Sequence, residues 1–482
     1  MLILALEAST TSAKTMLFDT ETQEVTVRTR RFVIGGEDAA VREAEGIFVQ
    51  LVQLGAEAAA GRSVDMVALS GTWHGLTVRE PDLSPITGVQ EWPYTGAQDL
   101  CADLRADKEF TRWFYERTGC MVNAIYPAFK LMLLARQGMD LTGGVVMDQN
   151  SYTFARLTGR RWTSYSQASG TGLLSTSFDD WDHEVIRRLG LDGIELPELH
   201  DGADTAPLTA QAASMLGVAA GTPVVVPAPD GGLNQVGEDA TEPGRMTFSM
   251  GTSGALRFAV GGPSLSPRMS TWAYRSPTGW LSGAAASGCT NCVDWAKGQL
   301  FGGAMTFDQL EPMLSARERD LPLFMPFLFG ERCPGWQDQR RGGFLELHPR
   351  HSRADMYQSV LHGVTFSLLH CYRELTALNG EPERIILSGG VLSSPFWTQL
   401  TADVFGVEME ISALQHSSTV GAVKMGLRAA GVESAQPALT EARRSTITPD
   451  LARTRRYAAE FARYLEGYAR TSPAEDVSGG AA

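Results

Sequence analysis

Short apolar runs that end in small polar residues recur along this chain. Residues 2–6 are apolar, a Ser- and Thr-rich segment follows Glu7, and a second apolar stretch begins at 15. Residues 246–250 enter Gly251-Thr252-Ser253-Gly254 in the same way, and residues 255–260 follow. Each pattern predicts two strands joined in a hairpin with a polar tip. Superposing Ser9 on Gly251 aligns Thr10 with Thr252, at an offset of about half the chain, which favours an internal duplication.

Other segments alternate between helical and strand patterns. A period near 3.6 predicts helices over 41–60, closed by Gly61, and from Ser352 to Asn379, where Asp355 completes a capping box. Residues 64–71 predict a strand that ends in a turn presenting Thr72, Trp73 and His74. Residues 384–388 predict a buried strand, and Ser394-Pro395 begins the next helix. The alternation indicates an α/β protein.

One acidic residue follows a strongly apolar strand in the first half. Three valines, 224–226, lead through residues 227–229 to Asp230, which Gly231 and Gly232 follow. We predict a turn that carries the Asp230 carboxylate into a cleft. Glycines in the segment 251–254 allow positive φ, so this tip can present N–H groups and hydroxyls to an anion. One acid beside a phosphate cradle suits phosphoryl transfer to a hydroxyl, and two ordinary strand-to-turn junctions are the alternative.

A second candidate for nucleotide contact lies near the end of the chain. The strand over 384–388 runs into Gly389-Gly390 and then into a helix N-terminus. Such a place lets an adenosine or a phosphate approach the backbone. A plain connection between a strand and a helix is the alternative.

Length and composition fit two large globular domains. A chain of 482 residues exceeds a single core, and we expect domains over 1–240 and 241–470, with a disordered tail over 471–482. The net charge of −14 argues against a nucleic-acid partner. No apolar stretch approaches a membrane span, and the start lacks the features of a signal peptide, so we expect a cytoplasmic protein without a membrane partner.

Six cysteines are scattered over the chain, as in a reduced compartment. Cys289 and Cys292 form a CxxC with no second pair to complete a zinc site. Buried structural thiols are the favoured interpretation, and a redox dithiol is the alternative.

Several motifs together resemble the FGGY carbohydrate kinases of the actin-like ATPase superfamily, over roughly residues 2–430. These motifs are residues 7–12, 70–75, 168–172, 230–231, 251–254, 327–334 and 388–391. The run from Gly251 to Arg257 and the Asp230-Gly231 pair look most similar to gluconate kinases, and His74-Gly75 looks more like xylulose kinases. Their order and spacing make the resemblance specific.

The resemblance implies two actin-like (ribonuclease H-like) α/β domains that face each other across a nucleotide cleft, and ATP-dependent phosphorylation of a small sugar, polyol or sugar acid. Asp230 would be the general base, and Glu7 would position Mg²⁺. The oligomeric state stays open, with a homodimer as one alternative. The phosphate and nucleotide contacts would come from Thr10, Thr11, Ser12, Lys14, Gly251, Thr252, Ser253, Gly254, Gly389 and Gly390. The sugar contacts would come from Trp73, His74, Trp92, Asp230 and Gly231, although His74 and Trp92 are also compatible with purely structural roles.

Four residues depart from the pattern of that family. Glu7 and Ser9 replace the usual Asp and Gly of the first loop, and a Ser at a position with positive φ would be strained. Tyr94 and Gly96 replace the usual Asp and Arg of the second sugar loop. The changes at Tyr94 and Gly96 predict weak activity on D-xylulose and D-gluconate, with Tyr94 offering its ring to another sugar. All four changes also motivate an alternative, a nucleotide-binding regulator with little kinase activity.

Overall fold

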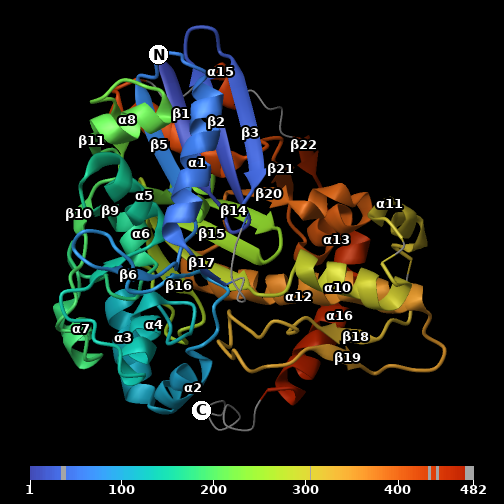
Figure 1. The fold of residues 1–482 in the computed structure, drawn as a ribbon. Helices are drawn as coiled ribbons and strands as arrows, with labels where there is room; N and C mark the ends of the chain where they lie inside the picture. The colour runs from blue at the N-terminus through green and yellow to red at the C-terminus, as the bar shows by residue number, and fades with distance from the viewer. Residues whose placement is uncertain (34–39, 304, 318, 433–435, 441–444, 473–482) are drawn as a thin grey trace.

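Two seven-stranded sheets, one from each half of the chain, form the frame of the molecule (Figure 1). The structure is a computed structural model and describes all residues except 34–39, 304, 318, 433–435, 441–444 and 473–482. The N-terminal sheet contains β1 Leu2–Ala8, β2 Ser12–Asp19, β3 Val25–Arg31, β5 Met66–Gly71, β11 Thr205–Pro207, β12 Pro223–Val225 and β13 Ala228–Pro229. The C-terminal sheet contains β14 Arg245–Met250, β15 Gly254–Val260, β16 Trp272–Ser276, β17 Gly279–Ala286, β20 Arg384–Gly389, β21 Met409–Ile411 and β22 Ser445–Ile447.

The two sheets repeat one topology. The order β3-β2-β1-β5-β12-β11 in the first corresponds to β17-β15-β14-β20-β21-β22 in the second. In both, the first three strands are antiparallel neighbours, the next two pairings are parallel, and the last is antiparallel. The duplication predicted from the two hairpins is therefore confirmed at the level of strand order and direction.

The repeat extends to single residues beside the hairpin tips. Ala8, the last residue of β1, pairs with Gly71 of β5, and Met250, the last residue of β14, pairs with Gly389 of β20. Each of these glycines follows a serine, Ser70 or Ser388. A Cβ added to Gly389 would lie 2.5 Å from the Met250 carbonyl oxygen, and one added to Gly71 would lie 2.9 Å from that of Ala8. The glycines thus allow each hairpin tip to approach the neighbouring strand.

Helices cover both faces of the N-terminal sheet. The helices of the first half are α1 Ala44–Ala59, α2 Gln98–Ala106, α3 Lys108–Thr118, α4 Pro127–Arg136, α5 Gln149–Thr158, α6 Tyr165–Ser169, α7 His183–Arg188, α8 Ala210–Leu216 and α9 Asp230–Gly237. Residues of α1, α5 and α8 share one buried apolar cluster with the sheet. The other face packs against α14, which comes from the second half of the chain.

The described part of the second half contains seven α-helices, and one of them, α14, packs against the N-terminal sheet. They are α10 Thr290–Phe301, α11 Phe307–Leu310, α12 Arg353–Asn379, α13 Pro395–Phe405, α14 Ser417–Ala429, α15 Pro437–Thr440 and α16 Leu451–Arg470, with single 3₁₀ turns η1 Glu311–Met313 and η2 Gly390–Ser393. Helices α9 and α14 touch backbone to backbone, because a Cβ on Gly237 would lie 2.0 Å from the Ser417 oxygen and one on Gly421 would lie 2.0 Å from that of Leu233. A boundary at 240/241 thus falls in the loop between α9 and β14, while α14 packs with the first domain.

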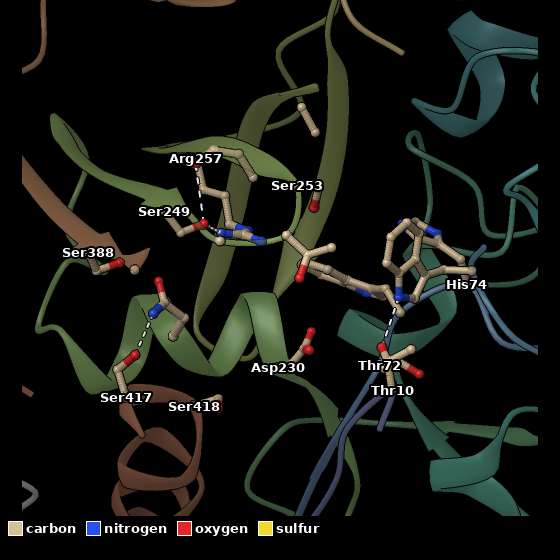
Figure 2. A pocket seen from close by; sticks show the side chains of 18 of the residues that line it. Thr10, Thr72, His74, Asp230, Ser249, Ser253, Arg257, Ser388, Ser417 and Ser418 are labelled. Carbon is tan, nitrogen blue, oxygen red and sulfur yellow. Dashed lines mark hydrogen bonds between the residues drawn. The ribbon is translucent and has the colours of Figure 1, made fainter. Parts of the chain in front are cut away.

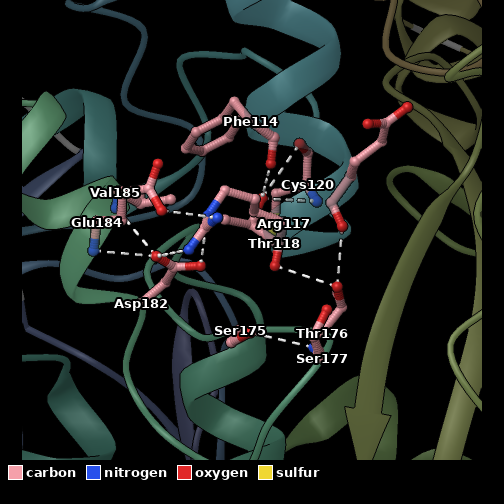
Figure 3. A network of polar contacts seen from close by, with 11 residues as sticks. Phe114, Arg117, Thr118, Cys120, Ser175, Thr176, Ser177, Asp182, Glu184 and Val185 are labelled. Carbon is pink, nitrogen blue, oxygen red and sulfur yellow. Dashed lines mark hydrogen bonds and ion pairs between the residues drawn. The ribbon is translucent and has the colours of Figure 1, made fainter.

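A helical lobe formed by α2, α3, α4 and α7 extends from the N-terminal half (Figure 1). Arg117 of α3 holds Asp182 with two hydrogen bonds of 2.9 Å, and Asp182 caps the N-terminus of α7 (Figure 3). The remaining two-stranded sheets pair β4 Val41–Arg42 with β7 Val89–Gln90, β6 Thr77–Arg79 with β8 Val145–Met147, β9 Trp162–Ser164 with β10 Glu198–His200, and β18 Leu323–Met325 with β19 Gly343–Leu345. One apolar cluster runs from this lobe into the C-terminal half, so the lobe and the second sheet share a core.

Most predicted elements are present, with local differences. The capping box of Ser352 and Asp355 begins α12, and Gly380 ends it. Ala60 is the left-handed residue that ends α1, and Gly61 after it also has positive φ, at 75°. Residues 473–482 of the predicted tail lie outside the described residues, and Thr471 accepts a hydrogen bond of 2.9 Å from Arg340. Among the helices in the described part of the chain, none has the length and apolarity needed to cross a membrane.

Candidate active site

A cavity of about 580 Å³ lies between the two halves, and residues from both sheets line it. The predicted site residues that reach it are Thr10, Lys14, Trp73, His74, Trp92, Asp230, Gly251, Thr252, Ser253 and Gly389. Figure 2 shows Asp230 between Ser388, Ser417 and Ser418 on one side and Thr10, Thr72 and His74 on the other. The two hairpin tips, distant in sequence, therefore meet at one site.

Asp230 is the first residue of helix α9, not part of a turn as the sequence pattern predicted. The short strand β13 ends at Pro229, and the helix begins directly after it. The N–H of Gly231 donates to Asp230 Oδ1 at 2.7 Å. Burial and, to a smaller extent, the charge of Glu7 raise the pKa of Asp230 to about 6, against the opposing effects of Arg257, the Gly231 N–H and Lys14. A carboxylate with this pKa accepts a proton more readily than an exposed aspartate does.

The hairpin tips differ from the predicted glycine geometry. Neither Gly251 nor Gly254 is among the described residues with positive φ. A Cβ on Gly251 would meet only the Ser253 oxygen, at 3.9 Å, so the space beside Gly251 is open to the cavity. A Cβ on Gly254 would lie 2.6 Å from the Leu368 side chain of α12. Gly251 thus leaves room for a ligand, whereas Gly254 is required by packing.

Several other predicted contacts lie outside the cavity. Thr11 is exposed, and Ser12 is buried, with its N–H and hydroxyl in hydrogen bonds with Ser9 Oγ. Ser9 is not among the positive-φ residues of the described chain, so the predicted strain is wrong, because Ser9 instead closes the turn through Ser12. Gly231 packs against the side chains of Trp73 and Arg257, and Gly390 begins the turn η2 beside Thr290. None of these four predicted contacts, Thr11, Ser12, Gly231 and Gly390, lines the cavity.

Glu7 is buried next to the cavity, where its carboxylate is the centre of a hydrogen-bond network. Its carboxylate accepts from Lys14 Nζ at 2.7 Å and from the hydroxyls of Ser70 and Thr419 at 3.0 and 3.2 Å, and Ser418 also donates to it. Although burial alone would raise the pKa of Glu7, the charge and hydrogen bond of Lys14 and the hydroxyl donors hold it below its usual value. Across the described ranges, no group of three or more His, Cys, Asp or Glu side chains forms a metal cluster.

Aromatic side chains form one wall of the cavity, across Asp230 from Ser417 and Ser418 (Figure 2). Trp73 donates from Nε1 to the Ser166 oxygen at 2.9 Å, and Trp92 donates from Nε1 to Thr10 Oγ1 at 2.9 Å. Trp272 and Tyr274, which the sequence patterns did not single out, stack with ring centroids 4.1 Å apart and also line the cavity. Trp92 therefore joins the predicted sugar wall to the first hairpin tip.

His74 presents one defined face to the cavity. Its Nδ1 lies 2.7 Å from the Gly170 oxygen, which can only accept, so Nδ1 carries the proton. Burial and the Arg332 guanidinium hold the pKa of His74 well below its usual value, so the ring is neutral and Nε2 is an acceptor. The backbone is held at φ 68°, and its carbonyl accepts from the buried Lys130 Nζ at 2.8 Å.

Two arginines that line the cavity were not predicted from the sequence as site residues. Arg257 projects from β15 and Arg332 follows Glu331, and both line the cavity. A lone cation in the otherwise apolar strand 254–260 was the available signal for Arg257. Tyr94, by contrast, does not line the cavity: its ring lies against Gly96, where a Cβ would be 2.3 Å from the Tyr94 hydroxyl. The prediction that Tyr94 offers its ring to the sugar is therefore wrong.

The cysteines lie away from this chemistry. All six are free and buried. Burial raises the pKa of Cys292 to about 12 and also raises that of Cys289. These thiols are therefore protonated and unreactive at neutral pH, which favours the structural interpretation over a redox dithiol.

The chain is similar to characterised kinases over most of its length. It is 24% identical over 450 residues to a gluconokinase of Bacillus subtilis, covering 89% of this chain and 88% of that one. It is 26% identical over 356 residues to a xylulose kinase of Escherichia coli, covering 72% of each. Among solved structures, a gluconate kinase and a ligand-bound xylulose kinase, both from Lactobacillus acidophilus, share the fold with a TM-score of 0.89 each, at 23% and 24% identity over 97% of this chain and 98% of theirs.

Two family models match the sequence. The N-terminal domain of the FGGY family of carbohydrate kinases matches residues 2–237, and its C-terminal domain matches residues 246–430. The first match covers the hairpin with Thr10, the aromatic wall and Asp230, and the second covers the hairpin with Gly251 and the strand that ends at Gly389. The chain therefore belongs to the FGGY family of carbohydrate kinases.

Proposed function

We propose that this protein transfers the γ-phosphate of ATP to a hydroxyl of a small sugar, polyol or sugar acid, with Asp230 as the general base. The observation that carries the proposal is the position of Asp230, the one carboxylate among the described residues that line the cavity. It lies between the two hairpin tips and the aromatic wall (Figure 2). The hydroxyl proton passes to Asp230 while the hydroxyl oxygen attacks the γ-phosphorus and the bond to the leaving ADP oxygen breaks.

The two hairpin tips suit the phosphates of the nucleotide. Thr10 and residues 251–253 present hydroxyls and backbone groups at the cavity, and Lys14 reaches it beside them. Ser388, Gly389 and Ser417 line the cavity beyond the second tip, where we place the nucleoside end of ATP. Asn234 of α9 donates to Ser417 Oγ at 2.6 Å, and this contact joins α9 to α14 beside that position.

Mg²⁺ fits this site as a companion of the nucleotide. Magnesium commonly binds through one or two carboxylates together with substrate phosphates and water, and Asp230 and Glu7 are the carboxylates at hand. Glu7 would hold it through water, because Lys14, Ser70, Ser418 and Thr419 already use its oxygens, and Asp230 would stay free to accept the hydroxyl proton. The ion would neutralise charge on the phosphates.

The test of the proposal is the formation of ADP and of a phosphorylated product in the presence of ATP, Mg²⁺ and a panel of pentuloses, polyols and aldonates. The regulatory alternative is not favoured, because Asp230 and the second hairpin tip both lie at the cavity and Ser9 is unstrained. Stabilisation by ATP without turnover on any acceptor would support the regulator. The free buried thiols support a reducing compartment, and we place the protein in the cytoplasm.

The raised pKa of Asp230 predicts how kcat/KM depends on pH. A general base must be deprotonated, and the pKa of Asp230 is raised to about 6. We therefore expect kcat/KM for the acceptor to fall about tenfold per pH unit below about pH 6 and to level off above about pH 7. Arg257→Gln removes a charge that opposes the rise and should move this limb to higher pH. A profile that stays flat from pH 5 to 7.5 would remove Asp230 from the role of base.

A further inference from the structure

Three buried hydrogen-bond donors at the cavity have no partner among the described residues. They are Nε of Arg257, Nε of Arg332 and Nε1 of Trp272. All three residues line the cavity. A buried donor without a partner is costly, and in native structures it commonly awaits a ligand, an ion or a water. Because all three are donors, the missing group is rich in acceptors.

Neither guanidinium group is in direct contact with a carboxylate in the described chain. Neither arginine forms an ion pair within the described chain, although salt bridges are present elsewhere. Arg257 has one side-chain partner, Ser249 Oγ, at 3.1 Å. Glu331, the acid next to Arg332 in sequence, pairs instead with Arg340 at 2.9 Å, and Asp338 pairs with Arg105 at 3.0 Å. Burial lowers the pKa of Arg257, the Asp230 carboxylate partly opposes this fall, and the neighbouring Arg332 guanidinium adds to it, so two cations lie near one carboxylate that is itself assigned to proton transfer.

The position of Arg332 separates it from the hairpin tips. Its charge acts on His74 and Tyr274 at the cavity, and on Tyr126, whose hydroxyl is hydrogen-bonded to that of Tyr274 at 2.7 Å. Arg257 lies between this wall and the base, since a Cβ on Gly231 would be 2.9 Å from Arg257 Nε and 2.6 Å from the Trp73 ring. Arg257 projects from the second hairpin beside Ser249, the strand neighbour of Ser388 (Figure 2), whereas the charge of Arg332 acts on the aromatic wall, so the two guanidinium groups reach the place of the phosphate acceptor beside Asp230 from two directions.

We infer that Arg332 and Arg257 bind the carboxylate of an acidic substrate, so that the acceptor is a sugar acid of the aldonate class rather than a neutral sugar. The inference rests on the proposed kinase function and narrows its substrate. A carboxylate accepts from both guanidinium groups and from the Trp272 indole, and its charge compensates the two cations. The Nε2 atom of neutral His74 then accepts from a hydroxyl of the same substrate.

Matched pairs of acceptors test this directly. Each aldonate of four to six carbons is compared with the alditol that has CH₂OH in place of its carboxylate, with ADP release as the readout. We expect kcat/KM to be at least about 100-fold higher for the best aldonate than for its alditol, because a site built for a charged group rejects the analogue that lacks it. Equal or better use of the alditols, or of neutral pentuloses, would overturn the inference and leave the kinase proposal intact.

Substitution of Arg332 tests whether this residue binds the substrate carboxylate. Arg332→Gln should lower kcat/KM for the aldonate by roughly 10- to 100-fold, as expected for a lost charge-assisted hydrogen bond. It should change the value for the alditol by less than about threefold and leave the KM for ATP unchanged. Arg332→Lys should recover part of the loss. Arg268→Gln, at a side chain that is 82% exposed, is the matched control and should behave as wild type.

Two outcomes distinguish binding of the substrate carboxylate by these arginines from binding of the nucleotide. An increase in the KM for ATP in Arg332→Gln, with the aldonate unaffected, would assign the guanidinium to the nucleotide and overturn the inference. Binding is measured independently of turnover, by thermal shift of the full chain with aldonates alone. Stabilisation in wild type that is lost in Arg332→Gln supports the carboxylate site even if no product forms, and no stabilisation by any aldonate at millimolar concentration contradicts it.

Discussion

Asp230→Asn is expected to lower kcat by roughly 10²- to 10⁴-fold, the usual contribution of a general base. The amide has nearly the same shape as the carboxylate and keeps an oxygen that can accept from the Gly231 N–H, now at 2.7 Å from Asp230 Oδ1. It cannot take the proton of the attacking hydroxyl. Steady-state kinetics on the best acceptor measure the loss, and a variant with wild-type kcat would refute the assignment.

The same substitution should not destabilise the fold. Because the pKa of Asp230 is raised from an ordinary 3.8 to about 6, the folded state binds this proton more tightly than the unfolded state does. Stability therefore falls as pH rises through this interval, and above pH 6 the ionised carboxylate costs about 3 kcal/mol. Removing the charge relieves this cost, so Tm at pH 7.5 should be equal to or above that of wild type. A large fall in Tm would mean that lost activity reflects unfolding.

Gly389→Ala should have the largest effect on stability among the loop substitutions. Gly389 has φ 99° and ψ −166°, a region that is essentially restricted to glycine and costs other residues about 1–3 kcal/mol. An added Cβ would also lie 2.5 Å from the Met250 carbonyl oxygen, so β14 and β20 would have to separate. We expect the free energy of unfolding to fall by roughly 2–4 kcal/mol and ATP binding to weaken, as measured by thermal unfolding with and without nucleotide.

Gly251→Ala is the control for that effect. Its backbone is not at positive φ, and a Cβ would meet only the Ser253 oxygen, at 3.9 Å. The Tm without ligand should stay within about 1 °C of wild type, since this is a substitution without strain or clash. The methyl group would enter the space proposed for the phosphates, so the stabilisation by ATP should decrease. Similar Tm losses in both variants would contradict the distinction between a glycine needed for the fold and one needed for the ligand.

Local and repeated patterns predicted much of this fold. The hairpins at 2–18 and 246–260 could be predicted because each consists of contiguous strands with a polar tip, and their similarity revealed the duplication. Helix α12 has its capping box and its apolar period within one segment. In contrast, the packing of α14 on the N-terminal sheet depends on contacts between residues more than 150 positions apart, which no local pattern contains.

Site residues could be predicted from the sequence only where they lie in a recognisable motif. Asp230 and Gly251 were found through their sequence context, but the reason for each glycine was not. Gly254 is fixed by Leu368, a tertiary contact, rather than by its φ. Tyr94 could be predicted as a departure from the family but not as a ring folded onto Gly96. The roles of Arg257 and Arg332 can be inferred only when their shared cavity, and the missing partners of their Nε atoms, are known.

The most direct test of the central claim follows the labelled γ-phosphate of ATP in the presence of the full chain, Mg²⁺ and an aldonate. We expect transfer of the label to the organic acceptor in equal amount to the ADP formed, and transfer reduced at least about 100-fold in Asp230→Asn, at the lower end of what a general base contributes. Release of the label only as inorganic phosphate, or equal transfer by wild type and Asp230→Asn, would contradict it.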